Sequence, residues 1–152
     1  MHYIGGVAGT TNTQFAVAAH ALTLLALLPP ELQTSDEMAV SIGTNAVHVR
    51  RVLARLRSAG LISSRPGPQG GWRLLRAPAE LSLADVWRAV HGDGAVLGIH
   101  DANPGCPIGQ QIQASLEKLD RVALGAIESE LETTTLADLA EQARPRSSAT
   151  TA

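Results

Sequence analysis

Arginine is the side chain through which this sequence could do chemistry, because seven arginines fall in one stretch that contains no acid. The stretch runs from Met38 to Ala79. The other five of the 12 lysines and arginines share the rest of the chain with all 14 acidic residues, so a +7 segment lies within a −9 remainder. Guanidinium groups pair with phosphates and with the edge of guanine. Charge of one sign predicts a face that binds a polyanion. The arginines are Arg50, Arg51, Arg55, Arg57, Arg65, Arg73 and Arg76.

Caps and glycines mark the helices that must position these arginines. Thr34 and Glu37 form a capping box, Gly43 breaks the short helix that follows, and Thr44 or Asn45 caps the next one. A buried helix, a short helix, a tight turn, a third helix and two strands follow the order of a winged helix-turn-helix. The fold class is therefore mainly α with a small β-hairpin wing. The predicted spans are 13–28, 34–41 and a third helix ending at 59, with strands at 61–64 and 72–76.

The third helix has two distinct faces. Val49, Val52, Leu53 and Leu56 repeat at helical spacing and form a core stripe, which leaves Arg51 on the opposite side. An exposed arginine near the start of such a helix can bind guanine in the major groove, a valine can touch a thymine methyl group, and arginines further along suit phosphates. The predicted contacts on the turn and helix are Thr44, Asn45, Val47, His48, Arg50, Arg51, Arg55 and Arg57, the last two to phosphates.

The segment RPGPQGGW, residues 65–72, is predicted to be the wing. Its prolines limit the conformations of the loop, and its glycines permit a tight turn and close approach of the backbone to a surface. Wing residues of this kind can reach a minor groove or its phosphates. The predicted contacts on the wing are Arg65, Gln69, Gly70, Gly71 and Arg73.

Two other uses of this surface are a solvated helix face and a winged-helix module that binds another protein. Both favour a surface of mixed charge or exposed apolar side chains, whereas this stretch offers arginine. We therefore predict double-stranded DNA as the partner and keep the protein-interaction module as the alternative. The sequence contains no evident nucleophile–base pair, phosphate-binding loop or metal-ligand triad, so we predict no enzymatic activity and no catalytic residue.

The second half of the chain is predicted to contain three more helices. Ser82 and Asp85 form a capping box that opens a helix through about Val90, Pro107 suits the first position of a long helix, and Thr135 caps a last helix over 136–142. The predicted organisation is a loose extension at 1–11, a winged helix-turn-helix domain at 12–92, a connecting or sensor loop at 93–106, a dimerisation helix and short C-terminal helix at 107–142, and a disordered tail at 143–152.

The long helix carries an apolar stripe that one chain would find hard to cover. From 108 to 131 it would span roughly 36 Å, which is at least the diameter of the rest of the domain. We predict that this helix crosses its symmetry mate in a homodimer, with a core helix lying along the first helix as the alternative. The predicted interface residues are Ile108, Ile112, Leu116, Leu119, Ala123, Ile127 and Leu131.

The run GTNAVHVRRVLARLRSAGLISSRPGPQGGWRL at 43–74, followed by LSLADVWRAVHG at 81–92, resembles the Rrf2 family of bacterial transcription regulators. The resemblance extends from about Thr13 through LADLAEQ at 136–142. It implies a homodimeric winged-helix repressor or activator whose third helix and wing contact an operator and whose long helix forms the dimer. By this resemblance Val47, His48, Arg50 and Arg51 read bases, and Arg65, Gln69, Gly70 and Gly71 belong to the wing.

The sequence departs from the family in the segment NPGCPIGQQI at 103–112. Many Rrf2 members hold an iron–sulfur cluster with three cysteines in this region, and Cys106 aligns with the last of the three. Because no second cysteine exists, we predict no cluster and no cofactor. His91 and His100 make a mixed histidine–cysteine metal site conceivable, but the ligand spacing is loose, and we predict no metal.

Cys106 leaves the regulatory signal open. A thiol at the start of a helix is made more reactive by the helix dipole, so Cys106 could sense an oxidant. It could equally be a packing residue, with a small ligand as the signal. The single cysteine fits a reducing compartment, the first 11 residues lack lysine and arginine, and the apolar run at 15–28 is short for a membrane span. We therefore predict a cytoplasmic protein with no membrane partner. The resemblance to the Rrf2 family, together with the predicted dimer, implies a repressor that binds a palindromic operator.

Overall fold

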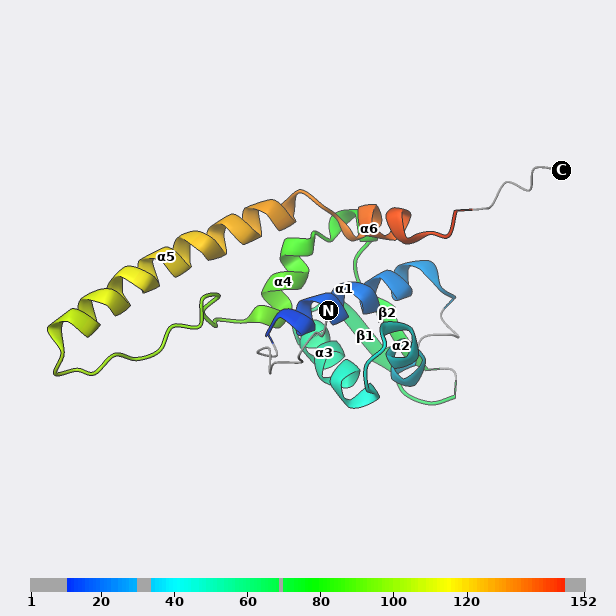
Figure 1. Ribbon diagram of the computed structural model, residues 1–152. Helices are drawn as coiled ribbons and strands as arrows, with labels where there is room; N and C mark the ends of the chain where they lie inside the picture. Colours follow the sequence, from blue (N-terminus) through cyan, green and yellow to red (C-terminus); the bar gives the residue numbers. More distant parts are fainter. Residues whose placement is uncertain (1–10, 30–33, 69, 147–152) are drawn as a thin grey trace, which may run out of the picture.

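The computed structural model describes residues 11–29, 34–68 and 70–146. Within these ranges six α-helices and one two-stranded antiparallel sheet form a rounded body from which one long helix projects (Figure 1). The fold is mainly α with a hairpin wing, as predicted. The elements are α1 Thr11–Leu27, α2 Ser35–Ile42, α3 Ala46–Ser58, β1 Ile62–Arg65, β2 Gly71–Leu74, a 3-10 helix η2 Pro78–Glu80, α4 Leu83–His91, α5 Pro107–Glu132 and α6 Leu136–Ala143.

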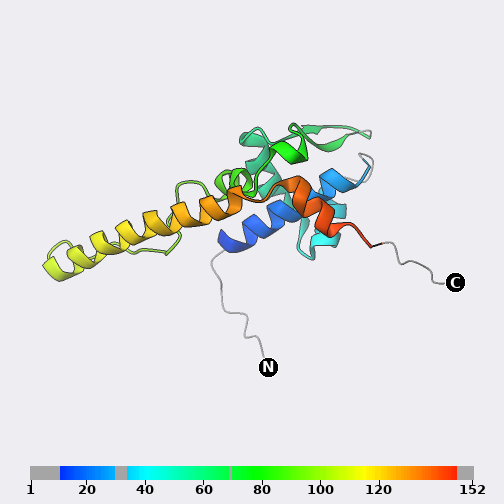
Figure 2. The same ribbon diagram turned by 90° about the horizontal axis from the view of Figure 1, so that it is seen from above.

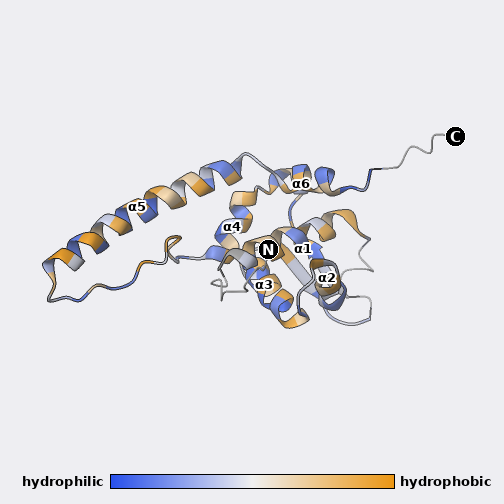
Figure 3. Cartoon of the chain, viewed as in Figure 1, coloured by the Kyte–Doolittle hydropathy of each residue, from blue (hydrophilic) through white to orange (hydrophobic). Residues whose placement is uncertain are grey.

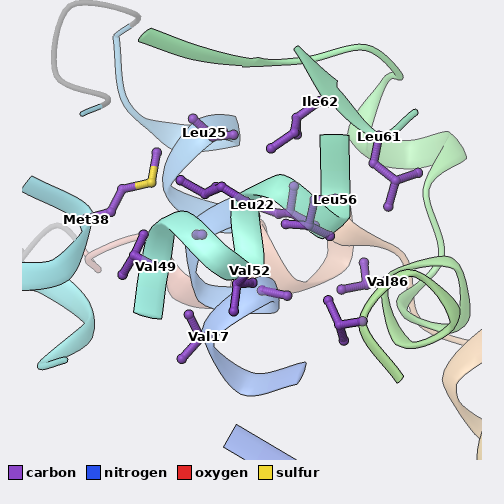
Figure 4. Close-up of a cluster of buried hydrophobic side chains, with 14 of the residues drawn as sticks. Val17, Leu22, Leu25, Met38, Val49, Val52, Leu56, Leu61, Ile62 and Val86 are labelled. Carbon is purple, nitrogen blue, oxygen red and sulfur yellow. The ribbon is translucent and has the colours of Figure 1, made fainter. Parts of the chain in front are cut away.

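The hydrophobic core is built around α1. This helix is apolar on most sides, and it contacts α2, α3, α4, α6 and β2. The predicted stripe of α3 is buried against it, with Val49, Leu53 and Leu56 at 0% exposure and Val52 at 1%. Figure 4 shows side chains from α1, α2, α3, β1 and α4 converging in this cluster. Burial of the stripe fixes which face of α3 points outward.

The hairpin lies directly after α3. At the turn, β1 ends one residue later than predicted and β2 begins one residue earlier, so the loop between them is shorter than predicted. The register pairs Ile62 with Leu74 and Arg65 with Gly71. The second strand ends at Leu74 rather than at the predicted position 76, because the chain turns toward η2. Arg76 stabilises that turn by donating to the backbone carbonyl of Glu80 and pairing with Asp85.

The junction between α5 and α6 is tied to the start of α4. Ser82 and Thr135 form an isolated antiparallel bridge, and each also caps its own helix in a capping box. Arg88 on α4 lies 3.6 Å from carboxylate oxygens of both Glu128 and Glu132 on α5. These contacts hold the C-terminal end of α5 on the body, while the rest of the helix extends away from it in both views (Figures 1 and 2).

Two predicted boundaries are corrected at the ends of the chain. Helix α1 begins at Thr11, so the last residue of the predicted extension at 1–11 is helical, and residues 1–10 lie outside the described part. Helix α6 reaches Ala143, one residue into the predicted tail, and 147–152 also lie outside the described part. Residues 93–106 contain neither helix nor strand. Among the described residues, no helix is both long and apolar enough to span a membrane.

Leu53→Ala should destabilise the protein by about 2–5 kcal/mol, because the fully buried leucine would leave a cavity between α3 and α1. Urea unfolding followed by circular dichroism at fixed protein concentration measures the change. Val40→Ala is the control, since Val40 is 84% exposed and its truncation should change stability by less than about 0.5 kcal/mol. Equal effects of the two substitutions would contradict the placement of the core.

Candidate nucleic-acid interface

The turn between α2 and α3 is set by two backbone caps. Gly43 ends α2 with φ at 77°, a left-handed conformation that favours glycine, and its N–H donates to Ala39. Asn45 then starts α3, since its side-chain oxygen accepts the N–H of His48 at 2.8 Å. The sequence left Thr44 and Asn45 as alternatives for this cap, and the structure assigns it to Asn45. Part of the Asn45 side chain is therefore occupied in holding α3.

Helix α2 is capped as predicted. The Thr34 hydroxyl accepts the N–H of Glu37 at 3.2 Å, and the Thr34 N–H donates to the Glu37 carboxylate at 3.0 Å. This backbone hydrogen bond, together with one from the Thr34 hydroxyl, lowers the pKa of Glu37 below its ordinary value. The charged cap fixes the start of α2, which in turn places the turn before α3.

The outward face of α3 presents one apolar and two charged side chains. Val47 is 52% exposed, and Arg50 and Arg51 are both exposed. Arg50 lies 3.9 Å from Asp36 of α2, a long and solvated ion pair that contributes little to stability. His48 and Thr44 are half-buried beside this face. The four predicted base-reading residues of α3 thus lie on or beside one outward surface.

The wing turn is closed by a hydrogen bond from the N–H of Gly70 to the carbonyl of Gly67 at 2.9 Å. A Cβ atom at Gly70 would overlap the backbone carbonyl of Arg65, so a side chain at this position cannot be accommodated without moving the turn. The predicted contact Gln69 lies outside the described residues. In Figure 1 the wing loop and the first turn of α3 both lie along the lower edge of the molecule.

Three arginines of the basic stretch bind other parts of the same chain. Arg55 donates through Nη1 to the carbonyl of Val90 and to the side chain of Gln14, both at 2.7 Å, and so joins α3 to α4 and α1. Arg57 contacts the hairpin, and Arg76 contacts the start of α4. These partners could not be read from the sequence, because those of Arg55 lie 41 and 35 positions away.

The remaining arginines are the ones available to a ligand. Arg51, Arg65 and Arg73 are exposed, and none of the three has a side-chain hydrogen bond or ion pair within the described part of the chain. They come from α3, β1 and β2. Together with the solvated Arg50, they place positive charge on both the helix and the wing, which is the distribution that binding to a phosphate backbone requires.

Helix α5 has one covered face and one open face. The segment before it is attached through side chains: Asp120, which is 8% exposed, accepts the N–H of Leu97 at 2.7 Å, and Gln113 accepts the N–H of Ala102 at 2.7 Å. Figure 3 shows hydrophobic positions recurring along the whole length of α5. Among the described residues, four large hydrophobic side chains of this helix are exposed, and their helical spacing puts them on a different face from Asp120 and Gln113. They are Ile108 at 73%, Ile112 at 53%, Leu119 at 57% and Val122 at 66%.

The open face of α5 differs from the predicted stripe at its C-terminal end. Leu131 packs against the core of its own chain, and Leu116, Ala123 and Ile127 are half-buried. Val122 is not among the predicted interface residues, yet it is one of the most exposed apolar residues of the helix. Its spacing of three from Leu119 was the signal that could have identified it.

The family follows from a match over most of the chain. Residues 11–142 match the Rrf2 family, which is described as an iron-dependent transcriptional regulator. The chain belongs to the Rrf2 family. The helix-turn-helix-type regulator YwnA of Bacillus subtilis strain 168 is 36% identical over 129 residues, covering 84% of this chain and 95% of YwnA.

Solved structures share the fold of this Rrf2 member. A transcriptional regulator from Lactobacillus plantarum gives a TM-score of 0.70 at 26% identity, covering 85% of this chain and 88% of that chain. The T. potens protein IscR gives a TM-score of 0.59 at 23% identity, covering 94% of this chain and 92% of IscR, and it shows the same fold. The predicted winged-helix fold and Rrf2 membership are confirmed.

The Rrf2 family is described as iron-dependent, but this chain lacks the side chains needed to hold an iron–sulfur cluster. Cys106 is the only cysteine in the sequence, and its Sγ accepts the N–H of Gly109 at 3.4 Å as the cap of α5. Within the described ranges no three histidine, cysteine, aspartate or glutamate side chains are placed to share a metal ion. Iron–sulfur clusters need cysteine or histidine ligands at nearly every site. The residues of this Rrf2 member do not fit such a cluster.

Anaerobic reconstitution with iron and sulfide should leave the purified protein without a cluster, because one thiolate per chain cannot ligate it. Absorbance between about 300 and 500 nm should stay at baseline, and the same should hold for Cys106→Ser. Stoichiometric binding of iron and sulfide by the native chain, lost in Cys106→Ser, would contradict the prediction and show that Cys106 is a cluster ligand.

Proposed function

We propose that this Rrf2 regulator binds a specific DNA sequence through α3 and the wing, and that it acts as a repressor in the cytoplasm. The observation that carries the proposal is the acid-free stretch 38–79, whose exposed arginines lie on α3 and on both strands of the hairpin. A protein partner with an apolar or mixed-charge surface would leave most of these like charges without counterparts. A duplex has phosphates on both sides of a groove, and it is matched by positive charge on two neighbouring elements.

The proposed contacts divide by their position. Arg51 points outward from α3 and suits the O6 and N7 atoms of guanine in the major groove, while Val47 suits a thymine methyl group. Arg65, Arg73 and the backbone of the wing turn suit the adjacent minor groove and its phosphates. Glycine at position 70 is required by the wing turn itself, since a Cβ there would overlap the backbone carbonyl of Arg65.

We propose a homodimer formed by the open face of α5. Helix α5 has 26 residues, or about 39 Å of length, and Asp120 is its only buried residue among those described. An apolar face that neither the body nor the preceding segment covers would be buried by the same face of a second copy. Two-fold symmetry of the protein then asks for an operator with two repeated half-sites. Occupation of such a site within a promoter is the basis for proposing repression.

We propose that the regulatory signal acts on the segment 93–106, either as a small ligand that binds there or as an oxidant that modifies Cys106. That segment is held to α5 by hydrogen bonds that a ligand or a modified thiol could alter, among them those of Gln113 and Asp120. Cys106 itself is half-buried at the start of α5. Comparison of operator binding with and without peroxide, in the native chain and in Cys106→Ser, separates an oxidant from a small-molecule effector.

The test of the proposed function is electrophoretic mobility with the DNA upstream of the protein's own gene. Binding that survives an excess of unrelated DNA supports a sequence-specific regulator. Binding that the unrelated DNA removes completely would favour the alternative, a winged-helix module that recognises another protein.

Arg51→Ala should weaken binding to the operator by about 1–3 kcal/mol and non-specific binding by much less, because a contact to a base edge is lost. Fluorescence anisotropy of labelled operator and labelled random duplex measures both affinities. Arg121→Ala, which removes an exposed arginine on α5, is the matched control and should change neither. An equal loss on both duplexes would make Arg51 a phosphate contact.

Leu119→Asp combined with Val122→Asp should produce monomers, because each carboxylate would have to be buried without a partner in the proposed interface. Light scattering during gel filtration at micromolar concentration reports the mass. Leu75→Asp is the control, since Leu75 is as exposed, at 57%, but lies outside α5. A native chain that elutes as a monomer at this concentration would remove the dimer from the proposal.

A further inference from the structure

Arg57 lies across the middle of the wing hairpin. Its Nη1 donates to the hydroxyl of Ser64 at 3.1 Å, and its guanidinium carbon lies 5.7 Å from the centroid of the Trp72 ring. Ser64 on β1 and Trp72 on β2 are directly paired in the sheet register. One side chain of the recognition helix therefore contacts both members of one cross-strand pair.

This arrangement uses properties that arginine has and lysine lacks. The guanidinium is planar, so it can lie over the indole ring while an N–H in its plane donates to the hydroxyl. A lysine ammonium could make the ring contact or the hydrogen bond, but its compact head does not offer both in one fixed geometry. The side chain Arg57 is thus suited to holding the hairpin rather than only to supplying charge.

The hairpin needs such support. It has two strands of four residues and no third strand among the described residues, and an isolated pair of this length is marginally stable. The end of the hairpin next to the core, which we call its root, is fixed, because Ile62 is buried and the N–H of Leu75 donates to the carbonyl of Leu61. Beyond the root, Ser64 and Arg65 are exposed, so Arg57 acts where the hairpin leaves the core.

We propose that Arg57 is a positioning residue that fixes the angle between the wing and α3, so that both engage one operator half-site together. The proposal rests on the proposed function, and it changes the role expected for Arg57, which the sequence assigned to a phosphate. A positioning role predicts that losing Arg57 lowers operator affinity through the wing. A phosphate role predicts that losing it lowers affinity for every duplex by releasing one fewer counterion.

The first test uses no DNA. The chain has two tryptophans, so in a Trp87→Phe background the fluorescence reports Trp72 alone. Arg57→Ala should increase acrylamide quenching and lower the anisotropy of Trp72, and Arg57→Lys should restore only part of the change. Arg73→Ala, which removes the neighbouring charge on β2, is the control and should leave this signal unaltered. An unaltered Trp72 signal in Arg57→Ala would overturn the proposal.

The second test measures operator binding over a range of salt concentrations, with circular dichroism to confirm that each variant is folded. Arg57→Ala should lose roughly three- to tenfold in affinity with the slope of log affinity against log salt unchanged. Trp72→Leu should cost a similar factor, and the double variant little more than either one, because both break the same contact. A slope reduced by about one in Arg57→Ala would make Arg57 a phosphate ligand and overturn the positioning role.

The two tests also separate this proposal from the proposed function. If the native chain binds no DNA specifically, the proposed function fails, whereas the Trp72 fluorescence still reports whether Arg57 holds the hairpin. If the native chain binds its operator and Arg57→Ala leaves both affinity and fluorescence unchanged, the positioning role alone is lost.

Discussion

The packing of α3 on α1 is the contact on which the rest of the structure depends. Four apolar side chains of α3 are almost completely buried there, and this burial determines the rotation of the helix about its own axis. A rotation that exposed Leu53 would cost several kilocalories per mole of hydrophobic free energy, on the order of 1.5–3 for each large side chain. The outward direction of Val47 and Arg51 is therefore a consequence of core packing, which fixes the surface that we propose binds DNA.

The basic stretch combines two kinds of arginine with different physical roles. Arg55 and Arg57 fold back onto the protein and connect α3 to α1, α4 and the hairpin. Hydrogen bonds from a charged donor are stronger than neutral ones, so these arginines stiffen the domain around α3. Arg51, Arg65 and Arg73 carry the charge that stays available. The separation means that affinity for a polyanion cannot be inferred from a count of arginines alone.

Helix α5 is held to the body at its C-terminal end by Arg88 and is followed along its length by the segment before it. That segment is attached through the side-chain amide of Gln113 and the carboxylate of Asp120. The hydrogen bonds that Gln113 and Asp120 accept from backbone N–H groups can fix the path of the segment, and they respond to different chemistry from a metal cluster. The consequence is a chain in which α5 keeps an apolar face open while the sequence supplies a single cysteine for iron.

The sequence by itself determined the order of the α-helices and strands, the N-terminal caps of α2, α4 and α6, the core stripe of α3 and the location of the basic segment. These features depend on neighbours within about four residues, through helical periodicity and local hydrogen bonds, so they can be predicted from a single sequence. Only the tertiary structure decided which arginines remain available, because the partners of Arg55 lie 35 and 41 positions away. It also decided which face of α5 is open. The apolar pattern of that helix is broad enough to support more than one stripe, and only the segment packed against Asp120 and Gln113 shows which side is covered.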